Sequence, residues 1–385
     1  MSEYQYYEFQ AVDRPLTKKQ MDELRAYSSR AHITPTSFVN VYNWGDFKGN
    51  PEKWMEKYFE AFLYLANWGN RRLMLRIPKR LLPPDVVSTY CTEETLSYRI
   101  KDDQLILSFS SEEEEQEWTD GEGWLDSIVS LRSDLMHGDH RCLYLGWLLA
   151  VQGGMLDNDT LEPPVPPGLR ELNAPLPSLA DFLRIDPDLI TAAAEKSDEK
   201  IAFRLSKEDI SRWLADTPQK EKDAILAGLI EGDNPYLAED LRRRALCALR
   251  GQTIPGIASQ ASGCRSVGQL IARADAIAEE RREKETQQRA RMKAKREREE
   301  AEKRKQHLGS VVGKESDLWA KVEKLIAAKQ PKEYDEAISV LRDLRDLADM
   351  EGRSSEFLPR MSALYREHGR KTALLNRFRK ARLPG

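Results

Sequence analysis

The spacing that comes closest to a metal site is the stretch MHGDHRC at residues 136–142. His137 and His140 are three residues apart, so both imidazoles can face one metal ion from the same side of a helix. Gly138, between them, is a residue type that often ends a helix, and Cys142 is followed by leucine. We therefore predict a junction of two helices with polar caps, and neither a bound metal nor a cofactor.

A second candidate is the stretch NWGDFKG at residues 43–49, in which two glycines flank an aromatic and two charged residues. Loops held on a rigid scaffold commonly carry binding residues. Trp44, Asp46, Phe47 and Lys48 are therefore candidates for contacting a ligand or a partner. The alternative is a structural loop that places its aromatic rings in the core.

Two clusters of basic residues have the composition of a phosphate-binding surface. Arg72 and Arg76 are an even number of residues apart, so on a strand they share one face. Arg291, Lys293 and Arg296 belong to the locally basic stretch RARMKAKRER. Such faces can pair with phosphates, which makes nucleic acid one partner class to test. The alternative for both clusters is a surface that contacts only water.

Motifs of the main catalytic families are missing from the sequence, which has no GxSxG, P-loop, GxGxxG or HExxH pattern. Acidic residues are numerous, but no spacing singles out an acid–base pair. We assign no catalytic residue and expect a non-enzymatic protein. An enzyme of unknown reaction, centred on residues 43–49 and the first sheet, is kept as an alternative.

Composition points to an intracellular protein of several domains. A length of 385 residues is typical of two to three domains, and a net charge of −4 argues against a protein that coats nucleic acid along its whole surface. The four cysteines are scattered, as expected in a reducing compartment. No signal peptide is recognisable, and no stretch reaches the roughly 18 apolar residues of a membrane span. We expect a cytoplasmic location and no membrane contact.

Alternating strand-like and helix-like patterns in residues 1–152 predict an α+β domain with a mainly antiparallel sheet. The helices are marked by capping residues, such as the Thr17–Gln20 capping box and the Asn50-Pro51 start. Asp102-Asp103 fits a tight turn between two strands. We expect strands at residues 4–12, 36–42, 71–77, 96–101 and 104–110, and helices at residues 17–29 and 50–67.

All-α segments are predicted beyond this domain. Residues 153–177 read as a proline-rich linker and residues 178–263 as a small α-helical domain. Residues 264–309 form a charged segment without proline, and its helix-forming residues predict one continuous helix over 265–307. Because heptad positions fail after Ile277, a solvated single helix, or a helix that rests on its own domain by one edge, is favoured over a coiled coil. Residues 310–385 predict a tail of four short helices, similar in architecture to a helical repeat.

Three N-terminal segments, YQYYEFQAVDRPLT, ITPTSFVNVYNWGDFKGNP and YLANWGNRRLML, resemble a family of uncharacterised bacterial proteins with this layout. The resemblance implies a bacterial cytoplasmic origin and carries no activity. The tail segment AKQPKEYDEAISVLRDLRDLA is similar to C-terminal helices of bacterial SWIM zinc-finger proteins. Their zinc motif, CxC followed by CxH, is missing here, so the similarity implies no zinc site.

These observations favour a cytoplasmic interaction or scaffold protein. A protein partner is expected to bind through the C-terminal helices, with the long charged helix linking this tail to the folded domains. A nucleic-acid-associated factor that uses the basic faces is the alternative from another class.

Overall fold

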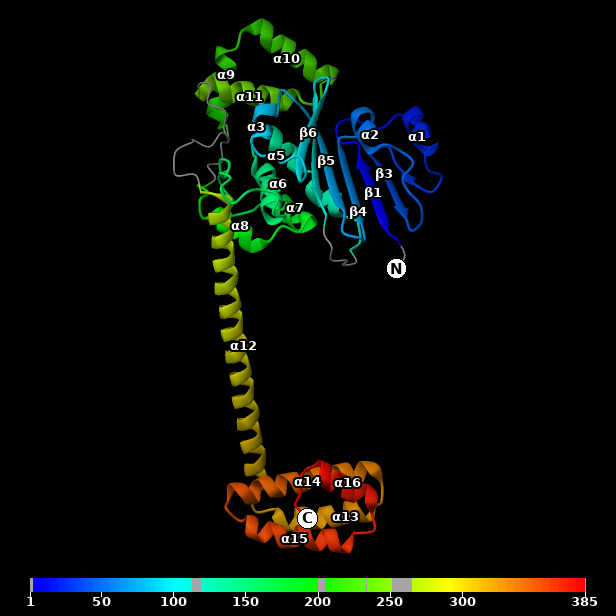
Figure 1. Cartoon of the computed structure of the whole chain (residues 1–385), viewed down its shortest axis with the longest axis vertical. Helices are drawn as coiled ribbons and strands as arrows, with labels where there is room; N and C mark the ends of the chain where they lie inside the picture. The colour runs from blue at the N-terminus through cyan, green and yellow to red at the C-terminus, as the bar shows by residue number, and fades with distance from the viewer. Residues whose placement is uncertain (1–2, 113–118, 200–204, 233, 251–264, 385) are drawn as a thin grey trace. The chain divides into compact units, whose positions relative to one another are not determined.

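A computed structural model describes residues 3–112, 119–199, 205–232, 234–250 and 265–384 (Figure 1). The chain divides into two compact units, Met1–Arg281 and Arg282–Gly385. The boundary falls inside the long helix α12 (Val267–Val311), so each unit contains a part of that helix.

The first unit is built on an antiparallel sheet of seven strands, in the order β2-β3-β1-β4-β5-β7-β6. This arrangement confirms the predicted α+β class with a mainly antiparallel sheet. The strands are β1 (Gln5–Gln10), β2 (His32–Ile33), β3 (Ser37–Tyr42), β4 (Ala61–Ala66), β5 (Arg71–Pro78), β6 (Leu96–Lys101) and β7 (Gln104–Ser111).

Both faces of the sheet are covered. On one face, Leu63 and Leu73 join a large core with the helices α4 (Trp124–Ile128), α5 (Leu131–Met136) and α6 (Arg141–Gln152). On the other face, Phe62 and Met74 join an aromatic core under α1 (Lys18–Arg25) and α2 (Pro51–Lys57). Neighbouring residues of one strand point to opposite faces, so β4 and β5 contribute to both cores.

The prediction of one helix over residues 50–67 is wrong in its second half. Asn50 does cap a helix, and its side chain accepts a hydrogen bond from the Lys53 amide, but α2 ends at Lys57 and β4 follows. The run AFLYLA is apolar because β4 is a central strand covered on both faces. Periodicity cannot separate such a strand from a buried helix.

The boundary predicted between residues 177 and 178 also needs correction. The helices α7 (Pro175–Leu183) and α8 (Pro187–Ala194) belong to the large core of the sheet domain and contact α4 and α6. The small domain expected over 178–263 therefore shrinks, within the described residues, to α9 (Lys207–Asp216), α10 (Gln219–Glu231) and α11 (Leu237–Arg250).

The long charged helix and the four-helix tail are confirmed as elements. The first turns of α12 enter the large core through Val267 and Leu270, and the middle of the helix is exposed. The tail helices α13 (Glu315–Ala327), α14 (Pro331–Met350), α15 (Ser354–Glu367) and α16 (Thr372–Lys380) share a core of their own. Among the described residues, no helix has both the length and the apolar composition needed to span a membrane.

Candidate partner-binding site

The helices α9, α10 and α11 form a three-sided module whose ends are set by local sequence signals. Ser206 begins α9 with a capping box that includes Asp209. Gly232 ends α10 with a φ of 67°, a left-handed conformation that glycine adopts without strain. Each helix carries an apolar face, and the three faces turn toward one another.

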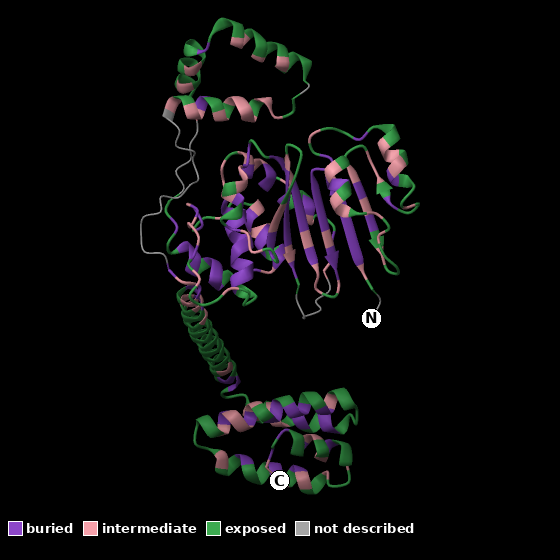
Figure 2. Cartoon of the chain, turned by 45° about the horizontal axis from the view of Figure 1, so that its top comes forward, coloured by how far each residue is buried: buried purple, intermediate pink, exposed green. Residues whose placement is uncertain are grey.

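These apolar faces enclose an open cavity of about 940 Å³. Neither α9 nor α10 has a buried residue, and Figure 2 draws most of the module in the colours of exposed and intermediate residues. Leu226 and Leu229 are 56% and 54% exposed, whereas the leucines of β4 are completely covered or nearly so. The apolar side chains that line the cavity include Ile210, Trp213, Leu214, Ile225, Leu226 and Leu229.

The charged groups at this cavity have one sign. Of the described residues that line it, Lys222 and Arg242 are the ones with a charged side chain, and both are basic. An apolar floor with a basic rim differs from an ordinary solvated helix surface, where both signs mix. The chemistry available here is apolar burial with attraction for a negatively charged flank.

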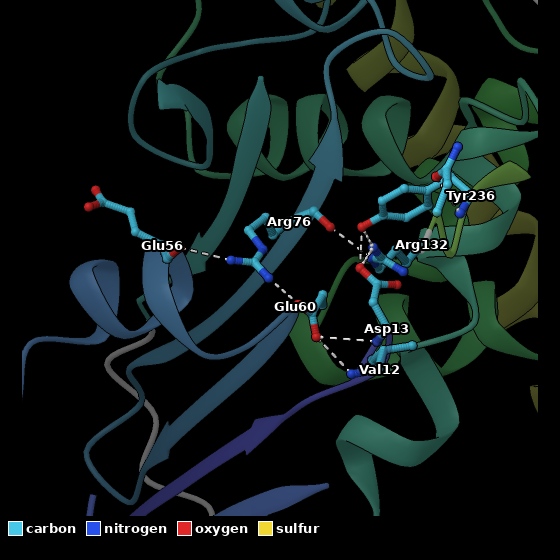
Figure 3. A network of polar contacts seen from close by, with 8 residues as sticks. Val12, Asp13, Glu56, Glu60, Arg76, Arg132 and Tyr236 are labelled. Carbon is cyan, nitrogen blue, oxygen red and sulfur yellow. Dashed lines mark hydrogen bonds and ion pairs between the residues drawn. The ribbon is translucent and has the colours of Figure 1, made fainter. Parts of the chain in front are cut away.

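A polar network holds the start of α11 against the sheet domain (Figure 3). The ring of Tyr236 lies 5.5 Å from the guanidinium groups of both Arg80 and Arg132. Its hydroxyl donates to the Asp13 carboxylate and accepts from Arg132 Nη2 at 2.8 Å. Burial raises the pKa of this tyrosine, so it stays protonated and keeps its role as a donor. Arg80 also makes a bidentate pair with Asp240, each bond 3.0 Å long.

Hydrogen bonds and ion pairs also connect this network to the strands. Arg132 pairs with Asp13 at 2.6 Å and donates from Nε to the Arg76 carbonyl at 2.7 Å. The Glu60 carboxylate pairs with the Arg76 guanidinium and accepts from the Val12 amide at 2.8 Å. The contacts therefore run from the end of β1 through β5 to α11, and they fix one wall of the cavity to a rigid scaffold.

The predicted recognition loop divides into a half-buried part and an exposed part. Phe47 stacks on Tyr7 with ring centroids 4.9 Å apart, so this half-buried aromatic packs against the core. Asp46 accepts a hydrogen bond from Gln5 Nε2 at 3.3 Å, which fixes the loop. Trp44 is 81% exposed and Lys48 is exposed as well. Trp44 and Lys48 thus remain available to a partner.

The structure corrects the first of the two basic clusters. Arg72 pairs with Glu52 at 2.6 Å and donates to Ser108 Oγ at 2.9 Å. Arg76 is covered and held by Glu60 and the Glu56 carbonyl. Both arginines do share one face of β5, but α2 and the residues after it lie on that face and supply the Glu52 and Glu60 carboxylates. Neither side chain is free to bind a phosphate.

The second basic cluster is exposed on α12. Lys293 and Arg296 lie 3.9 Å and 2.7 Å from Glu297 and Glu300 in pairs one turn apart. Arg291 is exposed on the same stretch. Exposed pairs of this kind contribute little to stability and exchange readily with other partners.

The residues of the stretch MHGDHRC lie in the large core and at the junction between α5 and α6. Cys142 is 1% exposed and points into the large core, and His140 is 4% exposed just before α6. Arg141 pairs with Asp139 at 2.7 Å and donates to the Gly168 carbonyl. In the described part of the chain, no three His, Cys, Asp or Glu residues come together in a group that can hold a metal ion.

Sequence reasoning found the apolar faces of α9 and α10 but not the cavity that they form. Tyr236 and its cationic neighbours were missed, because contacts between residues so far apart in the chain leave no local pattern. Comparison of the chain with family models, with curated proteins and with solved structures gave no match. The resemblances of the N-terminus and of the tail therefore stay predictions.

Proposed function

We propose that this chain is a cytoplasmic, non-enzymatic interaction protein that binds an amphipathic helix of a partner protein in the cavity of α9, α10 and α11. One observation carries the proposal: three helices present half-exposed apolar side chains around an open cavity of about 940 Å³. Large exposed apolar patches on water-soluble domains mark interaction surfaces. The free thiols of Cys91, Cys142 and Cys247 support the cytoplasmic location.

The expected partner has an apolar ridge with acidic residues beside it. A helix that enters a groove anchors itself through apolar residues at positions i, i+3, i+4 and i+7. Lys222 and Arg242 at the rim favour glutamate or aspartate next to that ridge. We call the cavity of α9, α10 and α11 the groove. Because Tyr236 fixes α11 to the sheet domain, one wall of the groove is already in place before the partner binds.

Partner binding through the C-terminal helices receives less support than the groove. The apolar faces of α13 to α16 bury one another, with Val322, Ile326 and Leu341 completely covered. A face that is already buried inside its own unit offers little area to a partner. The tail therefore stays a second, weaker proposal for protein binding.

The groove is tested with a synthetic probe helix that has a leucine ridge at i, i+3, i+4 and i+7 and glutamates on both flanks. We expect fluorescence anisotropy to show saturable binding to the full chain. The pair of substitutions Leu226→Gln and Leu229→Gln should weaken binding by about tenfold or more, because both side chains line the cavity.

Two further variants distinguish binding in the groove from nonspecific hydrophobic binding of the probe. Ile230→Gln is the matched control, because Ile230 lies on the same helix, is 86% exposed and does not line the cavity. Lys222→Glu should weaken the glutamate-flanked probe and strengthen a lysine-flanked one. Equal weakening by Ile230→Gln, or no binding by the unmodified chain, would overturn the proposal.

A further inference from the structure

Charge is divided unevenly between the two units. Residues 282–385 hold 27 Lys and Arg against 18 Asp and Glu, a net charge of +9. Residues 1–281 hold 33 Lys and Arg against 46 Asp and Glu, a net charge of −13. The chain total of −4 conceals this contrast. Such an asymmetry indicates that the basic part meets a polyanion.

Besides the basic stretch of α12, the second unit has a concentration of positive charge around α16. Residues 366–382 contain seven Lys and Arg and one acidic residue, Glu367. Leu374 and Phe378 turn the apolar side of α16 into the core of the unit. The basic residues are therefore left on its outer side and at its two ends.

Five of these basic residues are exposed and have no ion-pair partner among the described residues. We call them the α16 cations: Arg366, Arg370, Arg379, Lys380 and Arg382. The other two are engaged, because Lys371 donates to the Ile326 carbonyl at 3.1 Å and Arg377 pairs with Asp335 at 2.7 Å. Arg366 and Arg370 come before α16, Arg379 and Lys380 lie in its last turn, and Arg382 follows it. A helix of nine residues rises only about 13 Å, so the two ends of α16 are about that far apart.

We propose that the α16 cations bind the phosphate backbone of double-stranded nucleic acid, without reading its sequence. Single-strand binding needs exposed rings for base stacking, but Tyr365 packs on Phe378 and its hydroxyl donates to the Leu383 carbonyl. Binding to a membrane surface needs an exposed apolar face, but Leu374 and Phe378 are fully covered. This inference is independent of the groove in the first unit.

Binding is tested by fluorescence anisotropy of the full chain with a labelled DNA duplex, a labelled RNA duplex and a labelled single strand. At about 50 mM NaCl, we expect both duplexes to bind more tightly than the single strand. The logarithm of the association constant should fall with the logarithm of the salt concentration, with a slope of about −4 to −5 if five phosphates are contacted.

The triple variant Arg379→Gln, Lys380→Gln and Arg382→Gln should make that slope shallower by about 2 to 3. Its matched control is Lys284→Gln, Lys303→Gln and Lys305→Gln, which removes three exposed cations of the same unit from α12. Circular dichroism checks that both variants stay folded. Equal losses in the two variants, preference for the single strand, or no duplex binding at low salt would each overturn the inference.

Discussion

Arg265 and Glu162 form an ion pair that is almost fully covered at the base of α12. Arg265 donates from Nε and Nη2 to the carboxylate at 2.8 Å and 2.7 Å, and from Nη1 to the Ala192 carbonyl. The hydroxyl of Tyr144 also donates to this carboxylate. Removal of one partner leaves the other charge buried and unpaired, which is far more costly than the loss of an exposed pair.

We therefore expect Arg265→Ala to lower the free energy of unfolding of the first unit by about 3 to 5 kcal/mol. Urea denaturation followed by tryptophan fluorescence measures this change, since Trp147 packs on Tyr144. The double variant Glu162→Gln with Arg265→Met should lower the free energy of unfolding by less than the sum of the decreases caused by the two single substitutions. Strict additivity of the two would contradict the pairing.

His137 makes the contact between α5 and α11 sensitive to acid. Burial, and then the nearby Arg242 guanidinium, lower its pKa below the usual 6.5. Glu239 and Asp134 act in the opposite direction but do not outweigh these effects. Just below pH 6.5 the unfolded chain binds more protons than the folded chain, so stability falls as the pH drops through this window.

The substitution His137→Gln should flatten this part of the stability profile. We expect the melting temperature of the wild type to fall more steeply than that of the variant as the pH is lowered from about 6.5 to about 5. Differential scanning fluorimetry at several pH values measures both slopes. Parallel slopes would show that other groups cause the acid sensitivity.

At the scale of elements, local signals predicted most boundaries and tertiary context decided the exceptions. Thr17, Asn50 and the Asp102-Asp103 turn fall where the structure has a helix start, another helix start and a hairpin. The strand β4 was missed because its surroundings cover both faces. The cavity of α9, α10 and α11 was missed because an apolar face gives no indication of whether it will be covered.

The helix α12 was predicted from composition, and its exposed middle leads to an experiment on the isolated segment. Four ion pairs one turn apart lie between residues 285 and 300, and their side chains are 47% to 85% exposed. Each pair contributes about 0.2 to 0.5 kcal/mol and is screened by salt. A peptide of residues 265–307 should be helical by circular dichroism and lose part of that helix in high salt. A random-coil spectrum at low salt would contradict this prediction.

For the whole molecule, the separate packing of the two units and their opposite net charges lead to one prediction. The main core of the second unit contains residues of α13 to α16 together with Ala381 and Leu383, and none of its members comes from residues 1–281. We therefore expect fragments 1–281 and 282–385 to fold independently, each with a cooperative thermal transition. At neutral pH, the first fragment should bind an anion exchanger and the second a cation exchanger, because their net charges are −13 and +9. The sequence contained this contrast, but it became visible only once the structure had placed the boundary inside a continuous helix. Aggregation of either fragment at concentrations where the full chain stays monodisperse would show that the units need one another to fold.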